Sequence, residues 1–228
     1  MAGAFITFEG IDGCGKSTQL RLLASELRVR GVTVVTTREP GGTPLGQRLR
    51  AALLDVQEQV DPLTELLVFA ADRAQHVRRL LRPSLEMNQV VLSDRYADAT
   101  VAYQGAGRGF APDVIREVVE LATDGLRPDL TLVFDLSVAE SAVRTRRRVA
   151  NKQTDRLDSE DAEFHTRVRN AYLEIAKADP ARIKLIDARG AVQETHEAVM
   201  DIVMPFLKER GLVGADPSAG SKAPRGKR

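Results

Sequence analysis

The chain has 228 residues, of which 43% are hydrophobic and 29% charged, with a formal net charge of +1 and one cysteine. This length and hydrophobic content suit one α/β domain with a sizeable core. A net charge near zero gives no general polyanion-binding field, one cysteine allows no disulfide within the chain, and no apolar run reaches the roughly 20 residues of a membrane helix. Because the first residues also lack the basic segment of a signal peptide, we expect a cytoplasmic protein that binds neither nucleic acid nor membranes.

A glycine-rich segment follows the first predicted strand, residues 5–8, and leads into a predicted helix. The residues that match the Walker A pattern G-x-x-x-x-G-K-[ST] are Gly10, Gly15, Lys16 and Ser17. The glycines let backbone N–H groups face phosphate oxygens, the lysine brings a charge to the β- and γ-phosphates, and the serine hydroxyl suits Mg²⁺. The alternative is a glycine-rich turn with an incidental lysine, but the flanking strand and helix favour a phosphate loop.

A second strand, residues 32–36, completes a strand–helix–strand unit, which predicts a parallel sheet. Ligands of such sheets bind beyond the carboxyl ends of the strands. Arg38 follows this strand in the segment 38–43, so it is well placed to hold an anion. A plain turn with a solvated arginine is the alternative.

The pattern of residues 62–81 predicts one long helix. Its apolar stripe comprises Leu63, Leu66, Leu67, Ala70, Ala74, Val77 and Leu81. Phe69 and Arg73 are four residues apart and therefore share a face, where an aromatic ring beside a cation suits the stacking of a base and the binding of a phosphate or carbonyl group. The alternative is a phenylalanine at the edge of the core and a surface arginine. We assign no function to His76.

A third predicted strand, residues 89–96, ends in Asp94 and Arg95. In P-loop proteins, an acid at the end of a neighbouring strand completes the shell of Mg²⁺ and water, and an adjacent arginine can hold a second phosphate. A local ion pair is the alternative.

The segment that follows carries Thr100 and Gln104, four residues apart, and both can donate or accept hydrogen bonds at a base edge. Its Gly-x-Gly stretch, residues 105–107, predicts a close approach of the chain to a ligand. A polar loop without a ligand is the alternative.

The remaining elements are predicted helices over residues 111–122, 163–176 and 192–210 and strands over residues 129–135 and 183–187. Ser137 and Glu140 form a capping box for a further helix, which runs into the basic segment 144–156. This segment is either a solvated face or a lid whose arginines close over a transferring phosphoryl group. We predict one domain over residues 1–210 with a mobile lid at about 144–158, followed by a disordered basic tail over 211–228.

Six motifs occur in the order FEGIDGCGKST, TREPGGT, FAADR, SDRY, TVAYQGAGR and TDRLD. Together they make residues 5–210 resemble the thymidylate kinase family, and TREPGGT and YQGAGR are far more specific to it than the Walker A motif is. The resemblance implies a P-loop fold of nucleoside-monophosphate-kinase type, with a five-stranded parallel sheet flanked by helices. It also implies a homodimer that transfers a phosphoryl group from ATP to dTMP with Mg²⁺, giving ADP and dTDP in dTTP biosynthesis.

The resemblance implies a dTMP site formed by Asp12, Arg38, Phe69, Arg73, Arg95, Thr100, Tyr103 and Gln104. Phe69 would stack on thymine and Arg73 would bind a base carbonyl. Thr100 and Gln104 would complete the contacts to the base. Tyr103 would crowd the 2′ position of the sugar and Asp12 would meet its 3′-hydroxyl, while Arg38 and Arg95 would hold the phosphate.

The implied ATP-binding loop comprises Gly10, Ile11, Asp12, Gly13, Cys14, Gly15, Lys16, Ser17 and Thr18. One branch of the family carries an arginine inside this loop, but residues 11–14 supply no cation here. The chain is therefore similar to the bacterial branch, in which catalytic arginines lie in the lid. The implied catalytic residues are Lys16, Arg95, Arg146, Arg147, Arg148 and Arg156, and the implied metal ligands are Ser17 and Asp94.

Two other functions account for part of the sequence. A regulatory GTPase would explain residues 151–155, which resemble the guanine motif N-K-x-D, but the segment is one residue too long. A deoxynucleoside kinase would share the fold, but Arg38, Arg73 and Arg95 suit an acceptor that already bears a phosphate.

Cys14 stands where a small filler residue is sufficient. A thiol at a helix N-terminus can nevertheless be reactive. We hypothesise that alkylation of Cys14 blocks ATP binding.

Overall fold

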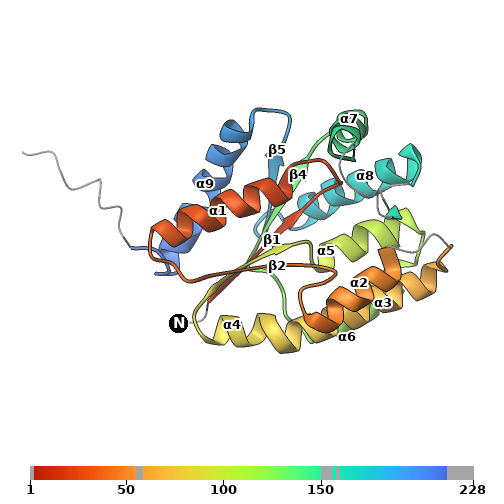
Figure 1. Cartoon of the computed structure of the whole chain (residues 1–228), viewed down its shortest axis with the longest axis horizontal. Helices are drawn as coiled ribbons and strands as arrows, with labels where there is room; N and C mark the ends of the chain where they lie inside the picture. The colour runs from red at the N-terminus through yellow and green to blue at the C-terminus, as the bar shows by residue number, and fades with distance from the viewer. Residues whose placement is uncertain (1–2, 55–58, 150–155, 158–159, 215–228) are drawn as a thin grey trace, which may run out of the picture.

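Five parallel strands form one sheet through the middle of the molecule (Figure 1). The structure is a computed structural model that describes residues 3–54, 59–149, 156–157 and 160–214. The strands are β1 (Ala4–Glu9), β2 (Val34–Arg38), β3 (Val90–Asp94), β4 (Leu130–Asp135) and β5 (Ile183–Asp187). Their order is β2-β3-β1-β4-β5, and each neighbouring pair is parallel. The predicted five-stranded parallel sheet is confirmed.

Helices cover both faces of this sheet (Figure 1). The longer ones are α1 (Lys16–Val29), α2 (Pro44–Leu54), α3 (Pro62–His76), α6 (Pro112–Thr123), α7 (Val138–Val149), α8 (Ala162–Ala178) and α9 (Val192–Glu209). The short ones are α4 (Arg82–Glu86), α5 (Ala97–Thr100) and the π-helical turns η1 (Val77–Leu81) and η2 (Val101–Gly107). Helix α2 is not predicted from the sequence, because its Pro44 and Gly46 resemble turn residues.

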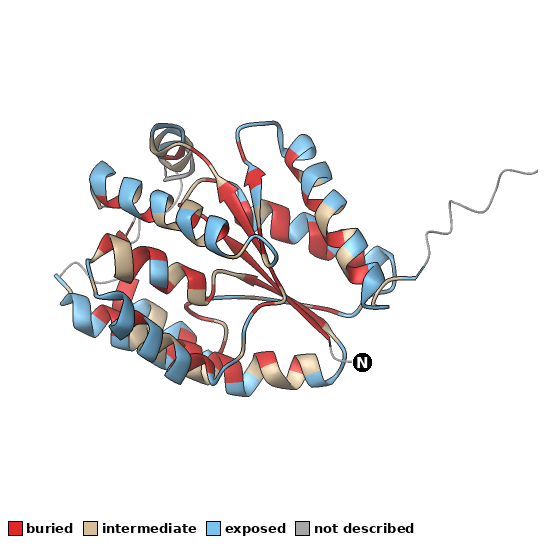
Figure 2. Ribbon diagram, turned by 180° about the vertical axis from the view of Figure 1, so that it is seen from behind, coloured by how far each residue is buried: buried red, intermediate tan, exposed pale blue. Residues whose placement is uncertain are grey.

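The middle strand, β1, is buried along its whole length, as expected for a strand with helices on both faces. Ala4, Ile6 and Phe8 point to one face, where they pack in a cluster with residues of α1 and α9. Phe5 points to the opposite face and meets the ring of Tyr96 edge-on, with 4.9 Å between ring centroids. Figure 2 shows that buried residues gather along the strands and on the helix surfaces that face them. The phosphate loop follows β1 directly and therefore begins at the buried middle of the sheet.

The predicted helix over residues 62–81 continues further than expected and is less regular. It consists of α3, η1 and α4 in succession, and the wide turn η1 comes just before Pro83, which lacks the N–H of a regular helix. The predicted apolar stripe is wrong in part, because Leu63 and Leu67 are 50% and 53% exposed. The buried residues of α3 are instead mostly polar: Glu65, Leu66, Asp72, Arg73 and His76. Apolar periodicity cannot identify a buried face of this kind.

Residues 97–107 are helical, so the Gly-x-Gly stretch lies within the turn η2 rather than in a loop, and its close approach to a ligand stays a prediction. Gly107 packs on Phe164 of α8, and an added Cβ would lie 2.6 Å from that ring. Gly105 faces Ile115 and lines a groove beside α6. The missing side chain of Gly107 thus allows η2 to pack closely on α8.

The last part of the chain contains the predicted capping box, lid and tail. Ser137 and Glu140 cap the start of α7 as predicted, with Ser137 Oγ accepting from the Glu140 N–H at 3.3 Å. The predicted lid, at about residues 144–158, is described only in part, over residues 144–149 of α7 and residues 156–157. Most of the predicted tail, residues 215–228, also lies outside them. Among the helices of the described ranges, none is long and apolar enough to cross a membrane.

Candidate active site

The loop between β1 and α1 has the backbone shape of a phosphate-binding loop. Gly10, Gly13 and Gly15 have φ angles of 133°, 76° and 97°, a region that is costly for residues with a side chain. Gly15 directly precedes the first turn of α1, which begins at Lys16. The free N–H groups of that turn and the helix dipole favour an anion at this point.

Lys16 lies at the base of this loop and is 5% exposed. Its Nζ donates to the Ile11 carbonyl at 3.5 Å and to Asp12 Oδ1 at 3.4 Å. Burial and the nearby Arg95 act to lower the pKa of Lys16, but Asp12 and other anionic groups outweigh them, and the pKa lies above its ordinary value. Lys16 therefore stays charged, and its long bonds are easily exchanged for bonds to phosphate oxygens.

Ser17 and Asp94 bring two oxygen ligands together beside the loop. Ser17 Oγ donates to Asp94 Oδ2 at 2.5 Å, which joins the first turn of α1 to the end of β3. Both residues line a groove that is open to solvent. A hydroxyl and a carboxylate in an open position fit Mg²⁺, which prefers oxygen and keeps several of its waters.

Arg95 connects the phosphate loop to a neighbouring cavity. Its Nη2 donates to Asp12 Oδ1 and Oδ2 at 3.1 and 3.0 Å and to the Tyr103 hydroxyl at 2.9 Å. Its guanidinium carbon lies 4.6 Å from the centroid of the Tyr103 ring. The φ angle of Arg95 is +70°, a left-handed conformation that is rare for a residue with a Cβ. Backbone strain of this kind concentrates at functional sites.

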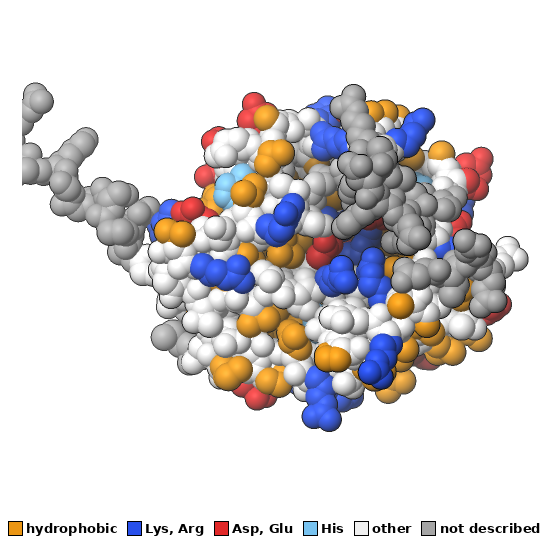
Figure 3. All heavy atoms as spheres, in the orientation of Figure 1, with side chains coloured by type: hydrophobic (Ala, Val, Ile, Leu, Met, Phe, Trp, Pro, Cys, Tyr) orange, Lys and Arg blue, Asp and Glu red, His pale blue; other side chains and the backbone are white. Residues whose placement is uncertain are grey.

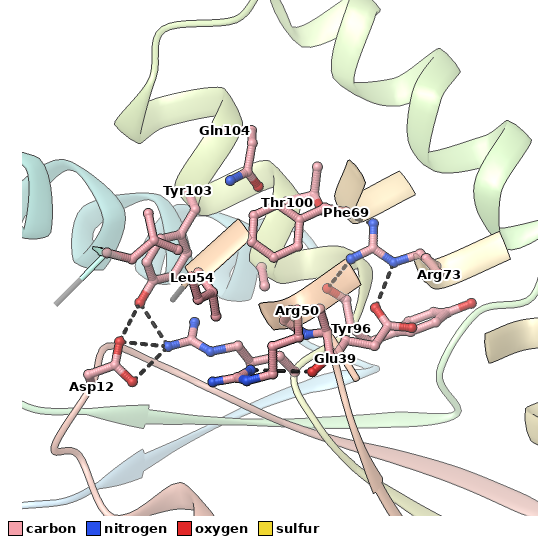
Figure 4. Close-up of a pocket in the computed structure, with 14 residues that line it drawn as sticks. Asp12, Glu39, Arg50, Leu54, Phe69, Arg73, Tyr96, Thr100, Tyr103 and Gln104 are labelled. Carbon is pink, nitrogen blue, oxygen red and sulfur yellow. Dashed lines mark hydrogen bonds and ion pairs between the residues drawn. The ribbon is translucent and has the colours of Figure 1, made fainter. Parts of the chain in front are cut away.

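The cavity beside Arg95 lies between α2, α3, η2 and the end of β3 (Figure 4). Its lining residues are Asp12, Glu39, Pro40, Arg50, Leu54, Phe69, Arg73, Arg95, Tyr96, Ala99, Thr100, Tyr103, Gln104 and Leu157. All residues predicted for the acceptor site except Arg38 are among them. In Figure 4, Asp12 and Tyr103 lie at one end, and Phe69 and Thr100 lie side by side further along. An aromatic ring, neutral hydrogen-bonding groups and cations in one cavity suit a base that carries a phosphate.

Arg73 is buried in the wall of this cavity and is 2% exposed, so it is not a surface arginine. Its Nε donates to Glu39 Oε2 at 2.8 Å and its Nη1 to Thr100 Oγ1 at 2.8 Å. Its Nη2 donates to the Tyr96 carbonyl at 2.9 Å. The three acceptors belong to different parts of the chain, and together they fix the plane of the guanidinium group.

His76, to which no function is assigned from the sequence, lies beside the wall of this cavity. His76 is fully buried, with Nδ1 at 2.8 Å from Glu39 Oε1 and Nε2 at 2.7 Å from Thr37 Oγ1. Glu39 thus contacts His76 with one oxygen and Arg73 with the other. His76 therefore supports the carboxylate that positions Arg73.

Arg38 lies apart from the other predicted acceptor residues. It is exposed and lines the groove that contains Ser17 and Asp94. Figure 3 shows several Lys and Arg side chains near the middle of the face that it draws. Arg38 is thus positioned for an anion in the groove rather than in the cavity.

The predicted lid arginines are only partly described. Arg146 is exposed on α7, and its Nε donates to the Ala142 carbonyl at 3.3 Å. The side chains of Arg147 and Arg148 lie outside the described residues. Arg156 donates to Glu65 and to the Leu53 carbonyl, so it faces the base end of the cavity rather than the phosphate loop.

The Cys14 thiol faces the core. It is 2% exposed and belongs to the cluster that contains Phe8 and Phe134. Burial raises the pKa of Cys14 although Lys16 acts in the opposite direction. This environment favours the filler role over the reactive thiol.

The cavity also contains residues that are not selected from the sequence. These are Glu39, Pro40, Arg50, Leu54, Tyr96, Ala99 and Leu157. Arg50 and Leu54 belong to the unpredicted helix α2, where a spacing of four residues puts them on one face. Glu39 and Tyr96 follow directly after Arg38 and Arg95 in TREPGGT and SDRY, so those motifs carried a usable signal.

The loop and the cavity lie at the carboxyl ends of neighbouring strands and meet at Asp12 and Arg95, and with the parallel sheet they define a P-loop nucleotide kinase. The family model for thymidylate kinase matches residues 8–199, which is most of the chain. The chain belongs to the thymidylate kinase family, as the sequence motifs imply, and is an enzyme of the kinase class.

Individual relatives agree with this assignment. The chain is 47% identical over 211 residues to the thymidylate kinase of Geotalea uraniireducens (strain Rf4), which covers 91% of this chain and 99% of that protein. It is 49% identical over 209 residues to the thymidylate kinase of Deinococcus radiodurans, covering 92% and 98% of the two chains. The crystal structure of thymidylate kinase from Ehrlichia chaffeensis has a TM-score of 0.73 and 36% identity to this chain, covering 90% of this chain and 100% of that one.

Proposed function

We propose that this chain transfers the γ-phosphoryl group of ATP to the phosphate of dTMP, giving ADP and dTDP. The observation that carries this proposal is the pair of hydrogen bonds between Asp12 of the phosphate loop and Arg95 of the cavity. Through these bonds, a loop suited to a nucleoside triphosphate adjoins a cavity suited to a nucleoside monophosphate. The choice of thymine follows from the relatives that are named thymidylate kinase.

On the donor side, the backbone N–H groups of the loop and the Lys16 ammonium bind the ATP phosphates. Ser17 Oγ and Asp94 would hold Mg²⁺, which when bound neutralises charge on the phosphates during transfer. An oxygen of the acceptor phosphate attacks the γ-phosphorus, and the bond from that phosphorus to the bridging oxygen of ADP breaks. No side-chain nucleophile is needed, so the protein acts through positioning and electrostatic stabilisation.

On the acceptor side, we assign Phe69 to stacking on thymine and Arg73 to a base carbonyl. Thr100 and Gln104 complete the contacts to the base. Tyr103 excludes a 2′-hydroxyl, and Arg95 holds the phosphate. The shared lining of one cavity by these residues supports the assignment.

The lid arginines Arg146, Arg147 and Arg148 are assigned to the transferring phosphoryl group. Their helix, α7, is attached to the phosphate loop, because Ser141 Oγ donates to the Asp12 carbonyl at 2.5 Å. Arg38 is assigned to the donor-side groove in this conformation, since it lines that groove. Arg156 is assigned to the support of Glu65, to which it is bonded.

A coupled assay of ADP release tests the proposal. It offers dTMP, dUMP, thymidine, AMP, CMP and GMP in parallel, with ATP and Mg²⁺. We expect strong turnover with dTMP, weak turnover with dUMP and negligible turnover with the others. Faster turnover of thymidine than of dTMP would indicate a deoxynucleoside kinase instead, and turnover of another nucleotide would overturn the assignment of the base-binding residues.

We also infer a cytoplasmic homodimer, since the proposed substrates are intracellular nucleotides and an apolar face is exposed. Helix α3 lies between α2 and α6, and these helices carry exposed apolar side chains at Leu45, Leu63, Leu67, Val114 and Leu121. Light scattering should give twice the 25.0 kDa chain mass, and Leu67→Glu should reduce it. A monomer of the unmodified chain would contradict the dimer.

A further inference from the structure

A buried carboxylate lies behind the base end of the cavity. Glu65 of α3 is fully buried and does not line the cavity itself. Gln104 Nε2 donates to its Oε1 at 2.8 Å. Arg108 donates from Nε to Oε1 at 3.1 Å and from Nη2 to Oε2 at 3.0 Å, and Arg156 Nη2 also donates to Oε2. One carboxylate thus accepts hydrogen bonds from a residue of the base site and from two cations.

Glu65 is ionised in spite of its burial. Burial acts to raise the pKa of Glu65, but hydrogen bonds from Arg108, Arg156 and Gln104 outweigh it, and the pKa lies below its ordinary value. An ionised carboxylate can only accept hydrogen bonds. Gln104 must therefore turn its amide nitrogen, and not its amide oxygen, toward Glu65.

The orientation of the Gln104 amide decides what the cavity offers to a base. With the nitrogen bonded to Glu65, the oxygen Oε1 is left for the cavity, and no protein group within the described ranges donates to it. Thr100 and Phe69 lie near it in the same wall (Figure 4). Thymine and uracil carry an N–H donor at ring position 3, whereas cytosine carries an acceptor nitrogen there. An acceptor from Gln104 therefore matches the first two bases and opposes the third.

We propose that Glu65 is a positioning residue that makes the acceptor site selective for imide pyrimidines over amino pyrimidines. Glu65 acts through the amide of Gln104 and does not touch the acceptor nucleotide. This inference rests on the proposed function, because it requires the acceptor base to lie beside Phe69 and Gln104.

The substitution Glu65→Gln is expected to reverse the orientation of the Gln104 amide. The glutamine introduced at position 65 has one oxygen and one NH₂ group, and it occupies nearly the same volume as glutamate. The position of Oε2 faces Nη2 groups of both Arg108 and Arg156, whereas the position of Oε1 faces one arginine N–H, Nε of Arg108, and the Gln104 amide, which can turn. The oxygen is therefore expected at the Oε2 position, where two arginine groups need an acceptor. The NH₂ group then faces Gln104, which must turn its own oxygen inward and its nitrogen toward the cavity.

The test compares kcat/KM for dTMP and 5-methyl-dCMP, which differ only at the base edge that carries position 3. We expect Glu65→Gln to lower the ratio of the two values about 10- to 100-fold, the effect of mispairing one buried hydrogen-bonding group. The KM for ATP should stay near that of the unmodified chain. A ratio that stays unchanged in a folded Glu65→Gln variant would overturn the inference.

Glu160→Gln is the matched control. Glu160 Oε1 accepts from Arg108 Nη2 at 2.6 Å in the same ion network, but within the described part of the chain Glu160 makes no hydrogen bond to Gln104. This variant should keep the ratio of the unmodified chain. An equal loss in Glu160→Gln and Glu65→Gln would show that the network acts only through general stability, which overturns the inference.

A double-mutant cycle isolates the route through Gln104. Gln104→Leu should lower the ratio, and adding Glu65→Gln to it should lower the ratio no further. A further loss in the double variant would show that Glu65 acts by another route. If Glu65→Gln does not fold, Glu65→Asp takes its place, because it keeps the charge for the arginines but withdraws it from Gln104; an unchanged ratio there would also overturn the inference.

The two proposals fail in different ways. If the unmodified chain phosphorylates neither dTMP nor 5-methyl-dCMP, the proposed function fails. If it phosphorylates dTMP and the ratio does not respond to residue 65, only the role of Glu65 fails.

Discussion

Arg95 and Asp12 are joined by two hydrogen bonds of 3.1 and 3.0 Å, so the phosphate loop holds a cation at one end of the acceptor cavity. Arg95→Ala removes that cation and should raise the KM for dTMP about 10- to 100-fold, as expected for the loss of a charged hydrogen bond. The KM for ATP should change little. Steady-state kinetics with each substrate varied in turn measures both values.

Arg38→Ala provides the comparison for this variant. Arg38 does not line the cavity, so its loss should raise the KM for dTMP less than the loss of Arg95 does. Lost ATP affinity together with an unchanged dependence on dTMP in Arg95→Ala would contradict the assignment of Arg95.

Gly107→Ala should destabilise the fold. The added Cβ would lie 2.6 Å from Phe164 Cε2 and 2.9 Å from Cζ, so the ring or the turn η2 must shift. We expect a loss of about 1–3 kcal/mol in the free energy of unfolding, measured by urea denaturation.

Gly105→Ala is the control for this variant. Its Cβ would meet only Ile115 Cγ1 and the Thr100 carbonyl, at 3.6 and 3.9 Å, which are ordinary contacts. Alanine in a helical segment should then be neutral or stabilise the fold by up to about 1 kcal/mol. Equal losses in the two variants would argue against the packing of η2 on α8.

Glu9 should make the stability depend on pH. It is fully buried at the end of β1 and accepts from the Tyr96 N–H and the Tyr172 hydroxyl, each at 2.7 Å. Burial, followed by the effect of Asp98, raises the pKa of Glu9 from 4.5 to about 8. The folded chain thus keeps a proton that the unfolded chain loses, so the free energy of unfolding should fall as the pH rises from 4.5 to about 8.

Glu9→Gln imitates the protonated side chain and should remove this dependence. At pH 8 the variant should be more stable than the unmodified chain by about 1–3 kcal/mol, and the difference should be smallest near the ordinary pKa of glutamate. Urea denaturation at a series of pH values measures the difference. A difference that is the same at every pH would rule out a raised pKa for Glu9.

Cys14 should react slowly with thiol reagents in the folded chain. Its burial and raised pKa leave little accessible thiolate, so we expect labelling at least about tenfold slower than in urea. Cys14→Ala should keep its activity, because the side chain acts as a filler. Labelled protein, confirmed by mass, should lose ATP binding because the adduct occupies the loop; full activity after complete labelling would refute that hypothesis.

Much of the fold can be predicted from the sequence because local patterns encode it. The strands are short apolar runs, the glycines at positions 10 and 15 mark the loop, and Phe69 and Arg73 share a face through simple helical spacing. Motif resemblance then gives most of the cavity. These signals need no knowledge of distant contacts.

The buried polar residues could not be predicted in this way. Glu65 and His76 lie on a helix whose apolar pattern points elsewhere, and their partners belong to other parts of the chain. Glu65 is bonded to Gln104, and His76 to Glu39 and Thr37. A buried charge is stable only with such partners, and sequence spacing does not reveal them.

Asp12 belongs to the phosphate loop and also holds Arg95 at the phosphate end of the cavity. Substitutions that alter this end of the cavity to accept a new nucleotide should therefore also weaken the binding of ATP. The base-binding residues Phe69 and Arg73 of α3 and Gln104 of η2 make no hydrogen bond to the loop among the described residues. Laboratory evolution toward new acceptor bases should accordingly gather substitutions on those two helical elements and spare residue 12.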